Sequence, residues 1–194
     1  MHYLVIVGNV GVGKTTTIHC IKNQVPESHV FIERKGHFLQ RFYADPSYAF
    51  LNQLDYSIQF LEQAVEIASL RSGNWVLQDR SIFDTHGVFS AMFAANGLIS
   101  SEQFQVLGQL HDLAGRLCCP SILIHLYARP QICLNRLKAR GDIEERDVQL
   151  SYLKELEDAH RRWFDSFGLC PKMEISTEES DPDQVVRRIM DALP

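Results

Sequence analysis

The sequence lacks the features typical of membrane-embedded, secreted and nucleic-acid-binding proteins. No apolar run approaches the ~20 residues that a membrane-spanning helix needs. The N-terminal segment leads directly into a short apolar run, without the basic region and cleavage site of a signal peptide. The net charge of -5 disfavours a surface that binds nucleic acid. We therefore expect a cytoplasmic protein whose partners include neither a membrane nor a nucleic acid.

Cysteine is too scarce and too irregularly spaced for a disulfide framework or a zinc site. The five cysteines are odd in number and show no C-x-x-C spacing. Internal repeats and low-complexity segments are also absent from the sequence. A chain of 194 residues with 45% hydrophobic residues can bury one core, so we expect a single domain over residues 1–194 with reduced thiols.

One stretch near the N-terminus carries a strong chemical signal. Residues 8–15, Gly-Asn-Val-Gly-Val-Gly-Lys-Thr, match the phosphate-binding P-loop pattern G-x-x-x-x-G-K-[ST]. A branched apolar run precedes them and a segment that can form a helix follows, which is the context that the motif requires. In such a loop backbone N–H groups bind phosphate, Lys14 reaches the β- and γ-phosphates, and Thr15 coordinates Mg²⁺. The predicted ATP-binding residues of this stretch are Asn9, Val10, Gly11, Val12, Gly13, Lys14, Thr15 and Thr16.

Five short apolar runs alternate with helical patterns along the chain. They cover residues 4–7, 30–32, 75–77, 122–126 and 173–175. This alternation, together with the P-loop, predicts an α/β P-loop NTPase fold in which helices flank a five-stranded parallel sheet. Ligands of such sheets bind beyond the carboxyl ends of the strands. That rule directs attention to Glu33 and to Asp79-Arg80, which follow the second and third runs.

The longest helical pattern covers residues 48–71. Its apolar residues recur at steps of three and four, which predicts that they face the core. They are Leu51, Leu54, Ile58, Leu61, Val65 and Ala68. Gln53 and Phe60 lie seven residues apart on a neighbouring face. Further along, Ser81 or Asp79 can cap one helix, and Ser100 with Gln103 can cap another.

Several blocks together resemble one family, the deoxynucleoside kinases that act on deoxycytidine, deoxyguanosine and deoxyadenosine. They follow the order and spacing of that family from residue 3 to about residue 165. The blocks are the P-loop, Glu33, Phe42-Tyr43-Ala44-Asp45-Pro46 with Gln53, Asp79-Arg80-Ser81, Arg136-Leu-Lys-Ala-Arg140-Gly141, Glu144-Glu145, and Tyr152-Leu153 with His160 and Trp163. The segment R-x-x-x-R-G and the segment from tyrosine to glutamine are more specific than the P-loop.

The resemblance implies ATP-dependent phosphorylation of a deoxynucleoside at its 5′-hydroxyl. It implies that Glu33 is the general base, and that Arg80 holds the hydroxyl and stabilises charge on the transferred phosphoryl group beside Lys14. Asp79, where the family usually has glutamate, would hold Mg²⁺ together with Thr15. Two lid arginines, Arg136 and Arg140, would reach the adenine and phosphates of ATP, with the lid covering about residues 139–147.

The resemblance also assigns residues to the deoxynucleoside. Tyr43 and Glu145 correspond to the pair that binds the sugar 3′-hydroxyl, and Gln53 corresponds to the amide that pairs with the base edge. The other predicted substrate residues are the aromatic Phe38 and Phe89, followed by Phe60 and Thr85. The last two stand where members that prefer purines or cytosine have an arginine and an aspartate, so the base preference stays open. A homodimer through helices near 82–95 and 102–117 is implied by the resemblance alone.

Two other interpretations stay open from the sequence. A nucleoside monophosphate kinase resembling thymidylate kinase, or another P-loop small-molecule kinase, would need extra cations, which Arg34-Lys35 could supply. A nucleotide-binding module without catalysis would tolerate Phe60, Thr85 and an aspartate, Asp142, in place of a third lid arginine. The presence of the predicted catalytic residues disfavours that module.

Overall fold

The computed structural model describes residues 2–141, 148–178 and 181–193, and a parallel sheet lies at its centre. The strands are β1 (His2–Gly8), β2 (His29–Phe31), β3 (Trp75–Asp79), β4 (Ile122–Tyr127) and β5 (Lys172–Ser176). Their order is β2-β3-β1-β4-β5, and each pairing is parallel. In the middle of the sheet, Leu4 of β1 pairs with Leu77 of β3 and with Ile122 of β4. The predicted five-stranded parallel sheet is confirmed.

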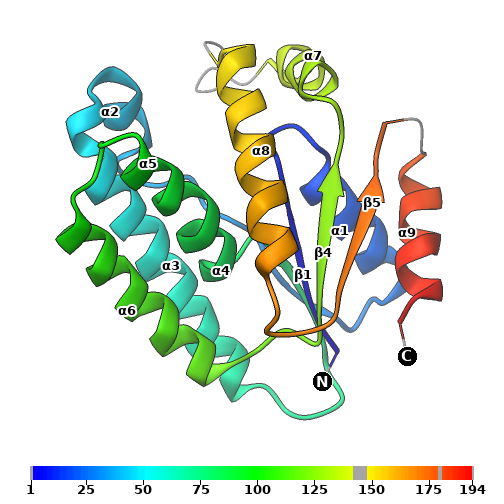
Figure 1. Cartoon of the computed structure of the whole chain (residues 1–194). Helices are drawn as coiled ribbons and strands as arrows, with labels where there is room; N and C mark the ends of the chain where they lie inside the picture. The colour runs from blue at the N-terminus through cyan, green and yellow to red at the C-terminus, as the bar shows by residue number, and fades with distance from the viewer. Residues whose placement is uncertain (1, 142–147, 179–180, 194) are drawn as a thin grey trace.

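Helices cover both faces of this sheet (Figure 1). They are α1 (Lys14–Gln24), α2 (Leu39–Ala44), α3 (Ala49–Ser69), α4 (Ile82–Asp84), α5 (Ala91–Ala95), α6 (Ser101–Leu117), α7 (Pro130–Arg140), α8 (Leu150–Ser166) and α9 (Pro182–Asp191), with a 3₁₀ turn η1 (Pro46–Tyr48) and a π-helical turn η2 (Thr85–Ser90). On one side α1 packs against α9, and on the other α3 packs against α6. Among the described residues, none of the helices is both long and apolar enough to cross a membrane.

Side chains of β1 alternate between two hydrophobic cores. Leu4 and Ile6 pack in the core that α1 and α9 complete, whereas Tyr3 and Val5 pack in the core that α3 completes. This alternation is expected of a strand that is buried on both faces. Because β1 is held from both sides, the loop that follows Gly8 begins at a fixed position.

The predicted core-facing stripe of the long helix is wrong for most of its residues, although Leu54 and Leu61 pack against hydrophobic cores. In α3, Leu51, Ile58 and Val65 are 39%, 45% and 55% exposed, respectively. The buried face instead combines apolar residues with three glutamines whose side chains bond groups inside the molecule. Gln59, for example, bonds both the N–H and the carbonyl of Arg34, at 2.8 and 3.0 Å. Polar residues that are satisfied in this way are invisible to a pattern based on hydrophobicity.

The helical segment that follows β3 is broken by the π-helical turn η2. Its start is as predicted, since Ser81 caps α4 in a capping box with Asp84. The second predicted box, Ser100 with Gln103 at the start of α6, is also confirmed. The turn η2 holds Gly87 so close to α8 that a Cβ atom there would lie 2.2 Å from the ring of Trp163. Such π-helical turns occur frequently at functional sites.

Candidate active site

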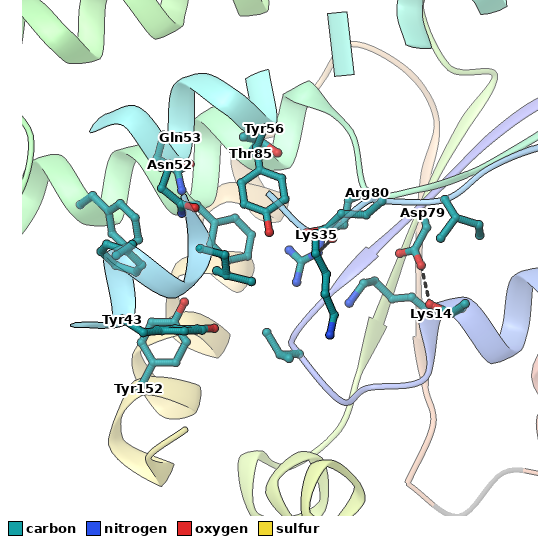
Figure 2. A pocket seen from close by; sticks show the side chains of 18 residues that line it. Lys14, Lys35, Tyr43, Asn52, Gln53, Tyr56, Asp79, Arg80, Thr85 and Tyr152 are labelled. Atoms are coloured by element: carbon teal, nitrogen blue, oxygen red, sulfur yellow. Dashed lines mark hydrogen bonds and ion pairs between the residues drawn. The ribbon is translucent and has the colours of Figure 1, made fainter. Parts of the chain in front are cut away.

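A cavity of about 190 Å³ lies beyond the carboxyl ends of β1, β2 and β3 (Figure 2). Ten of the predicted site residues line it: Val10, Lys14, Thr15, Glu33, Tyr43, Gln53, Asp79, Arg80, Thr85 and Phe89. Figure 2 shows two ends. We call the first the charged end, formed by Lys14, Thr15, Glu33, Asp79 and Arg80. We call the second the amide end, formed by Asn52, Gln53, Thr85 and Phe89.

Glycines shape the loop that forms one wall of the charged end. Gly8 has a φ of +141°, and a Cβ atom there would lie 2.1 Å from the carbonyl oxygen of Leu126. Gly13, directly before α1, has a φ of +109°, which glycine adopts at little cost. The chain can therefore turn tightly and direct the first N–H groups of α1 outward. Such groups, with the helix dipole, form an anion-binding site.

Lys14 is buried at the floor of the charged end. Its Nζ donates hydrogen bonds to the carbonyl oxygens of Gly8 and Asn9, at 3.2 and 3.1 Å. Burial, and then the positive charge of Arg80, lower the pKa of Lys14 to about 8, whereas the neighbouring carboxylates oppose this shift. An ammonium group that has lost most of its water interacts strongly with any anion that enters.

The side chain of Asn9 points away from the cavity. Its Nδ2 donates to the carbonyl of Leu153 at 2.8 Å and to Oε2 of Glu157 at 3.2 Å. Its Oδ1 accepts a hydrogen bond from the N–H of Val10. Asn9 therefore anchors the P-loop to α8, and only its backbone remains for the predicted contact with ATP.

Thr15 and Asp79 meet across the charged end, as the predicted metal site requires. Thr15 Oγ1 donates to Asp79 Oδ2 at 2.5 Å, which is the dashed line in Figure 2. The other carboxylate oxygen, Oδ1, is buried and has no hydrogen-bond partner. Within the described ranges no group of three or more His, Cys, Asp or Glu side chains could hold a metal ion. These two oxygen ligands nevertheless fit Mg²⁺, which commonly takes its remaining ligands from water and phosphate.

Glu33 and Arg80 form an ion pair in the middle of the cavity. Arg80 Nε lies 2.7 Å from Glu33 Oε2, and its guanidinium lies 4.5 Å above the ring of Phe89. Arg34, the next residue in the sequence, pairs with Glu62 at 3.2 Å and not with Glu33. Burial raises the pKa of the Glu33 carboxyl, although Arg80 and then Lys14 oppose that shift. The carboxylate is thus kept inside the cavity and is more basic than an exposed glutamate.

The backbone of Arg80 is strained. Its φ of +60° lies in the left-handed region, which non-glycine residues seldom adopt. The guanidinium also forms an ion pair with Asp84, with Nη1 of Arg80 3.5 Å from Oδ2 of Asp84. Strain of this kind persists where the surroundings fix the residue, and it clusters at functional sites.

At the amide end, α3 and η2 bring together side chains that can hydrogen-bond a ligand. Gln53 and Thr85 are both buried, and the hydroxyl of Ser90 donates to Gln53 Oε1 at 3.1 Å. Tyr43 and Tyr152 lie across the cavity from Gln53 (Figure 2). An aromatic wall, which includes Phe89, completes this end. The arrangement resembles a small-molecule pocket, with apolar walls and a few polar groups that fix orientation.

Two predicted substrate residues do not reach the cavity. Phe60 is 1% exposed and packs in the hydrophobic core with Tyr3 and Val5. It lies two turns of α3 beyond Gln53, where this face of the helix contacts the sheet and no longer the cavity. Phe38 does not line the cavity, and its ring lies 6.3 Å from that of Tyr48. A third predicted residue, Glu145, lies outside the described residues, as does most of the predicted lid.

A second cavity of about 310 Å³ borders the P-loop. Its lining includes the predicted ATP-binding residues Gly11, Val12, Gly13, Thr16, Arg136 and Arg140. Arg136 donates to the carbonyl of Val12 at 3.1 Å and to both the hydroxyl and the carbonyl of Thr177. The P-loop therefore contributes residues to both the first and the second cavity.

The sequence did not single out several residues that line the first cavity. They are Ile32, Lys35, Leu39, Phe42, Asn52, Tyr56, Phe93 and Tyr152. Tyr152 and Phe42 belong to blocks that carried the family resemblance, and Lys35 was considered only as a cation for an acceptor phosphate. Asn52 could have been found as the neighbour of Gln53, but nothing in the hydrophobic pattern indicates that both amides are buried.

Comparisons with known proteins agree with this geometry. Residues 4–193 match the family model described as deoxynucleoside kinase. The chain is 30% identical to a deoxyadenosine kinase of Dictyostelium discoideum, over 96% of this chain and 77% of that protein. It is 26% identical to a deoxyadenosine/deoxycytidine kinase of Bacillus subtilis, over 92% of this chain and 83% of that protein. A solved deoxyadenosine kinase from M. mycoides with bound dATP superposes with a TM-score of 0.82 at 18% identity, covering 98% of each chain, which confirms the predicted P-loop NTPase fold.

Proposed function

The chain belongs to the deoxynucleoside kinase family, and we propose that its first cavity transfers the γ-phosphoryl group of ATP to the 5′-hydroxyl of a deoxynucleoside. The observation that carries this proposal is the placement of Glu33. Its carboxylate, paired with Arg80, lies in the same cavity as Lys14 of the phosphate-binding loop. An acid beside a phosphate site is the arrangement that phosphoryl transfer to an alcohol needs.

In this proposal Glu33 accepts the proton of the 5′-hydroxyl as that oxygen attacks the γ-phosphorus atom. The raised pKa of Glu33 makes it a better proton acceptor than an ordinary carboxylate. Arg80 fixes the carboxylate through its Nε, and its positive charge stabilises the charge that develops on the transferred phosphoryl group. Lys14 supplies a second cation from the other side of the transferred group, where it exchanges its carbonyl partners for phosphate oxygens.

Mg²⁺ would bind through the oxygens of Thr15 and Asp79 and neutralise charge on the β- and γ-phosphates. The unpartnered Asp79 Oδ1 supports this assignment, because a buried acceptor without a partner is costly unless a ligand satisfies it.

The adenosine part of ATP is assigned to the second cavity. Arg136 and Arg140 would lie against the adenine and the phosphates, with Thr16 and the glycines of the loop on the opposite side. A lid over about residues 139–147 would exclude water during transfer and so suppress hydrolysis of ATP.

The deoxynucleoside is assigned to the rest of the first cavity. Gln53 pairs with the base edge, Phe89 packs on the base beside Thr85, and Tyr43 binds the 3′-hydroxyl together with Glu145. In this orientation the 5′-carbon points toward Glu33 and Lys14. We place the reaction in the cytoplasm.

A homodimer is also part of the proposal, through α6 and its neighbour α3. Both helices carry exposed apolar side chains: Leu51, Ile58 and Val65 on α3, and Val106, Leu113 and Leu117 on α6. Exposed apolar surface of this kind is typical of interaction sites. The other predicted dimer segment, residues 82–95, buries its apolar residues Val88, Met92 and Phe93 within the chain. An Ile58→Glu variant should sediment as a monomer, whereas the exposed charge change Glu66→Gln should leave the dimer intact.

The activity is tested by measuring ADP release with ATP, Mg²⁺ and each of the four deoxynucleosides plus deoxyuridine. We expect turnover with at least one of them and none with the matching monophosphates. Lys35 also lines the cavity and could bind an acceptor phosphate. Turnover with the monophosphates alone would therefore replace this proposal with a nucleoside monophosphate kinase.

A further inference from the structure

Three side chains that line the first cavity contain a buried polar atom without a hydrogen-bond partner. They are Asp79 through Oδ1, Arg80 through Nη1 and Asn52 through Oδ1. The first two belong to the charged end, where Mg²⁺ is assigned to Asp79 and Nη1 of Arg80 lies 3.5 Å from Oδ2 of Asp84. Asn52 lies at the amide end and is only 2% exposed. Its unpaired oxygen has no ligand in that mechanism.

We propose that Asn52 accepts a hydrogen bond from an N–H group of the nucleobase and thereby helps to hold the base in the cavity. This inference rests on the proposed function, since it requires that a nucleoside occupies the cavity. An amide oxygen is an acceptor with two lone pairs, so its natural partner is a donor on the ligand. A buried acceptor without a partner destabilises the free protein, and the bound base removes that cost.

The neighbouring residue, Gln53, supplies the complementary group. The Ser90 hydroxyl lies 3.1 Å from Gln53 Oε1 and also 3.1 Å from the carbonyl oxygen of Thr85, and its single proton serves one of these acceptors at a time. In either case Nε2 of Gln53 remains a donor. Figure 2 shows the two amides next to each other on α3, on the same side of the cavity. An acceptor beside a donor matches a base edge on which a donor lies beside an acceptor.

Each of the common bases offers such an edge, but the donor comes from two chemical sources. In adenine and cytosine it is the exocyclic amino group, beside a ring nitrogen that accepts. In thymine and guanine it is a ring N–H beside a carbonyl oxygen. Both sources provide the same chemistry to Asn52, and nucleoside analogues that lack one donor can distinguish them.

An unpaired buried oxygen is not by itself a binding group, and α3 contains a matched case. Ser57 is fully buried, and its Oγ also has no hydrogen-bond partner, yet Ser57 does not line the cavity. The two residues therefore differ in whether the side chain borders the cavity. Ser57→Ala provides the control for any general effect of removing an unpaired oxygen from this helix.

The experiment compares wild type, Asn52→Leu and Ser57→Ala on two pairs of nucleosides. One pair is deoxyadenosine and purine 2′-deoxyriboside, which lacks the amino group, and the other is thymidine and 3-methylthymidine, which lacks the N3–H. The quantity of interest is the ratio of kcat/KM within each pair. Nucleoside affinity without ATP, measured by calorimetry, gives a second readout that does not depend on catalysis. Asn52→Ala serves as the second variant where Asn52→Leu does not fold.

We expect the Asn52 variant to lose discrimination in at least one pair, by roughly 10-fold or more, because the donor no longer meets an acceptor. The pair that changes identifies the source of the donor, and Ser57→Ala should keep both ratios. Unchanged ratios in the Asn52 variants would overturn the proposal, as would a loss shared equally by both members of each pair. If wild-type protein neither binds nor phosphorylates a nucleoside, the proposed function itself fails, which is a different result.

Discussion

The charged end and the amide end of the first cavity are built in different ways. At the charged end, a short motif places Lys14 and Thr15, and the strand ends place Glu33 and Asp79 opposite them. At the amide end, Gln53 owes its position to the packing of α3 and η2 and to a bond from Ser90. The first construction follows from a sequence motif and the order of the strands, and the second depends on the packing of individual side chains. Changes at the charged end should therefore affect catalysis, and changes at the amide end should affect the choice of substrate.

The largest effect should follow removal of the cation at the charged end. Lys14→Ala should lower kcat by on the order of 10³-fold, because the γ-phosphate loses its buried ammonium group. Nucleoside affinity without ATP should change little, since the amide end is untouched. Initial rates and calorimetry measure the two quantities separately. If Lys14→Ala weakened nucleoside binding as strongly as catalysis, the division into two ends would be wrong.

The pH dependence of kcat/KM should reflect the protonation states of Glu33 and Lys14 at the charged end. The base must be deprotonated, so activity should fall as the pH drops through the pKa of Glu33, which burial raises above that of an ordinary glutamate. Lys14 must be protonated, so activity should also fall as the pH rises through about 8 in the free enzyme. Each limb should decline about tenfold per pH unit. A profile that stays flat well above pH 8 would contradict the lowered pKa of Lys14.

A smaller loss of kcat/KM, which depends on the base, is expected when Gln53 is replaced. Gln53→Leu should lower kcat/KM by about 10- to 100-fold through the loss of hydrogen bonds to the base. The loss should depend on which base is offered, whereas the loss in Lys14→Ala should be the same for all nucleosides. Steady-state kinetics on the panel of deoxynucleosides measures both patterns, and a uniform loss in Gln53→Leu would remove Gln53 from base recognition.

The smallest effect should come from Ser90, which touches Gln53 but does not line the cavity. Ser90→Ala should raise KM by about fivefold and leave kcat close to that of wild type, because the hydroxyl contacts Gln53 and the Thr85 carbonyl at the amide end and nothing at the charged end. Ser69→Ala, an exposed change at the end of the same helix as Gln53, is the control. A fall in kcat without a change in KM would indicate that Ser90 acts on the charged end instead.

The same contrast explains what the sequence could predict. The P-loop is a contiguous motif, and the rule for strand ends in parallel sheets led to Glu33 and Arg80 without knowledge of distances. The burial of α3 was predicted wrongly because its inner face is rich in glutamine, and hydrophobic periodicity cannot detect polar groups that are satisfied by tertiary partners. Phe60 was placed at the substrate by correspondence alone, and packing puts it in the core.

Asn52 shows the same limitation at the level of one residue. Its neighbour Gln53 was predicted from the family resemblance, but no local pattern indicates that two successive amides on a helix are both buried beside a cavity. Only the tertiary structure reveals the unpaired oxygen that makes Asn52 a candidate for base recognition.

The most direct test of the catalytic proposal is a Glu33→Gln variant, assayed for both turnover and nucleoside affinity. Glutamine keeps the size and a hydrogen bond to Arg80 but cannot accept a proton, so kcat should fall by about 10²- to 10⁴-fold while the dissociation constant of the nucleoside stays close to that of wild type. Glu62→Gln, which changes the exposed partner of Arg34, should retain full activity. A Glu33→Gln variant that turns over at the wild-type rate would contradict the assignment of the general base.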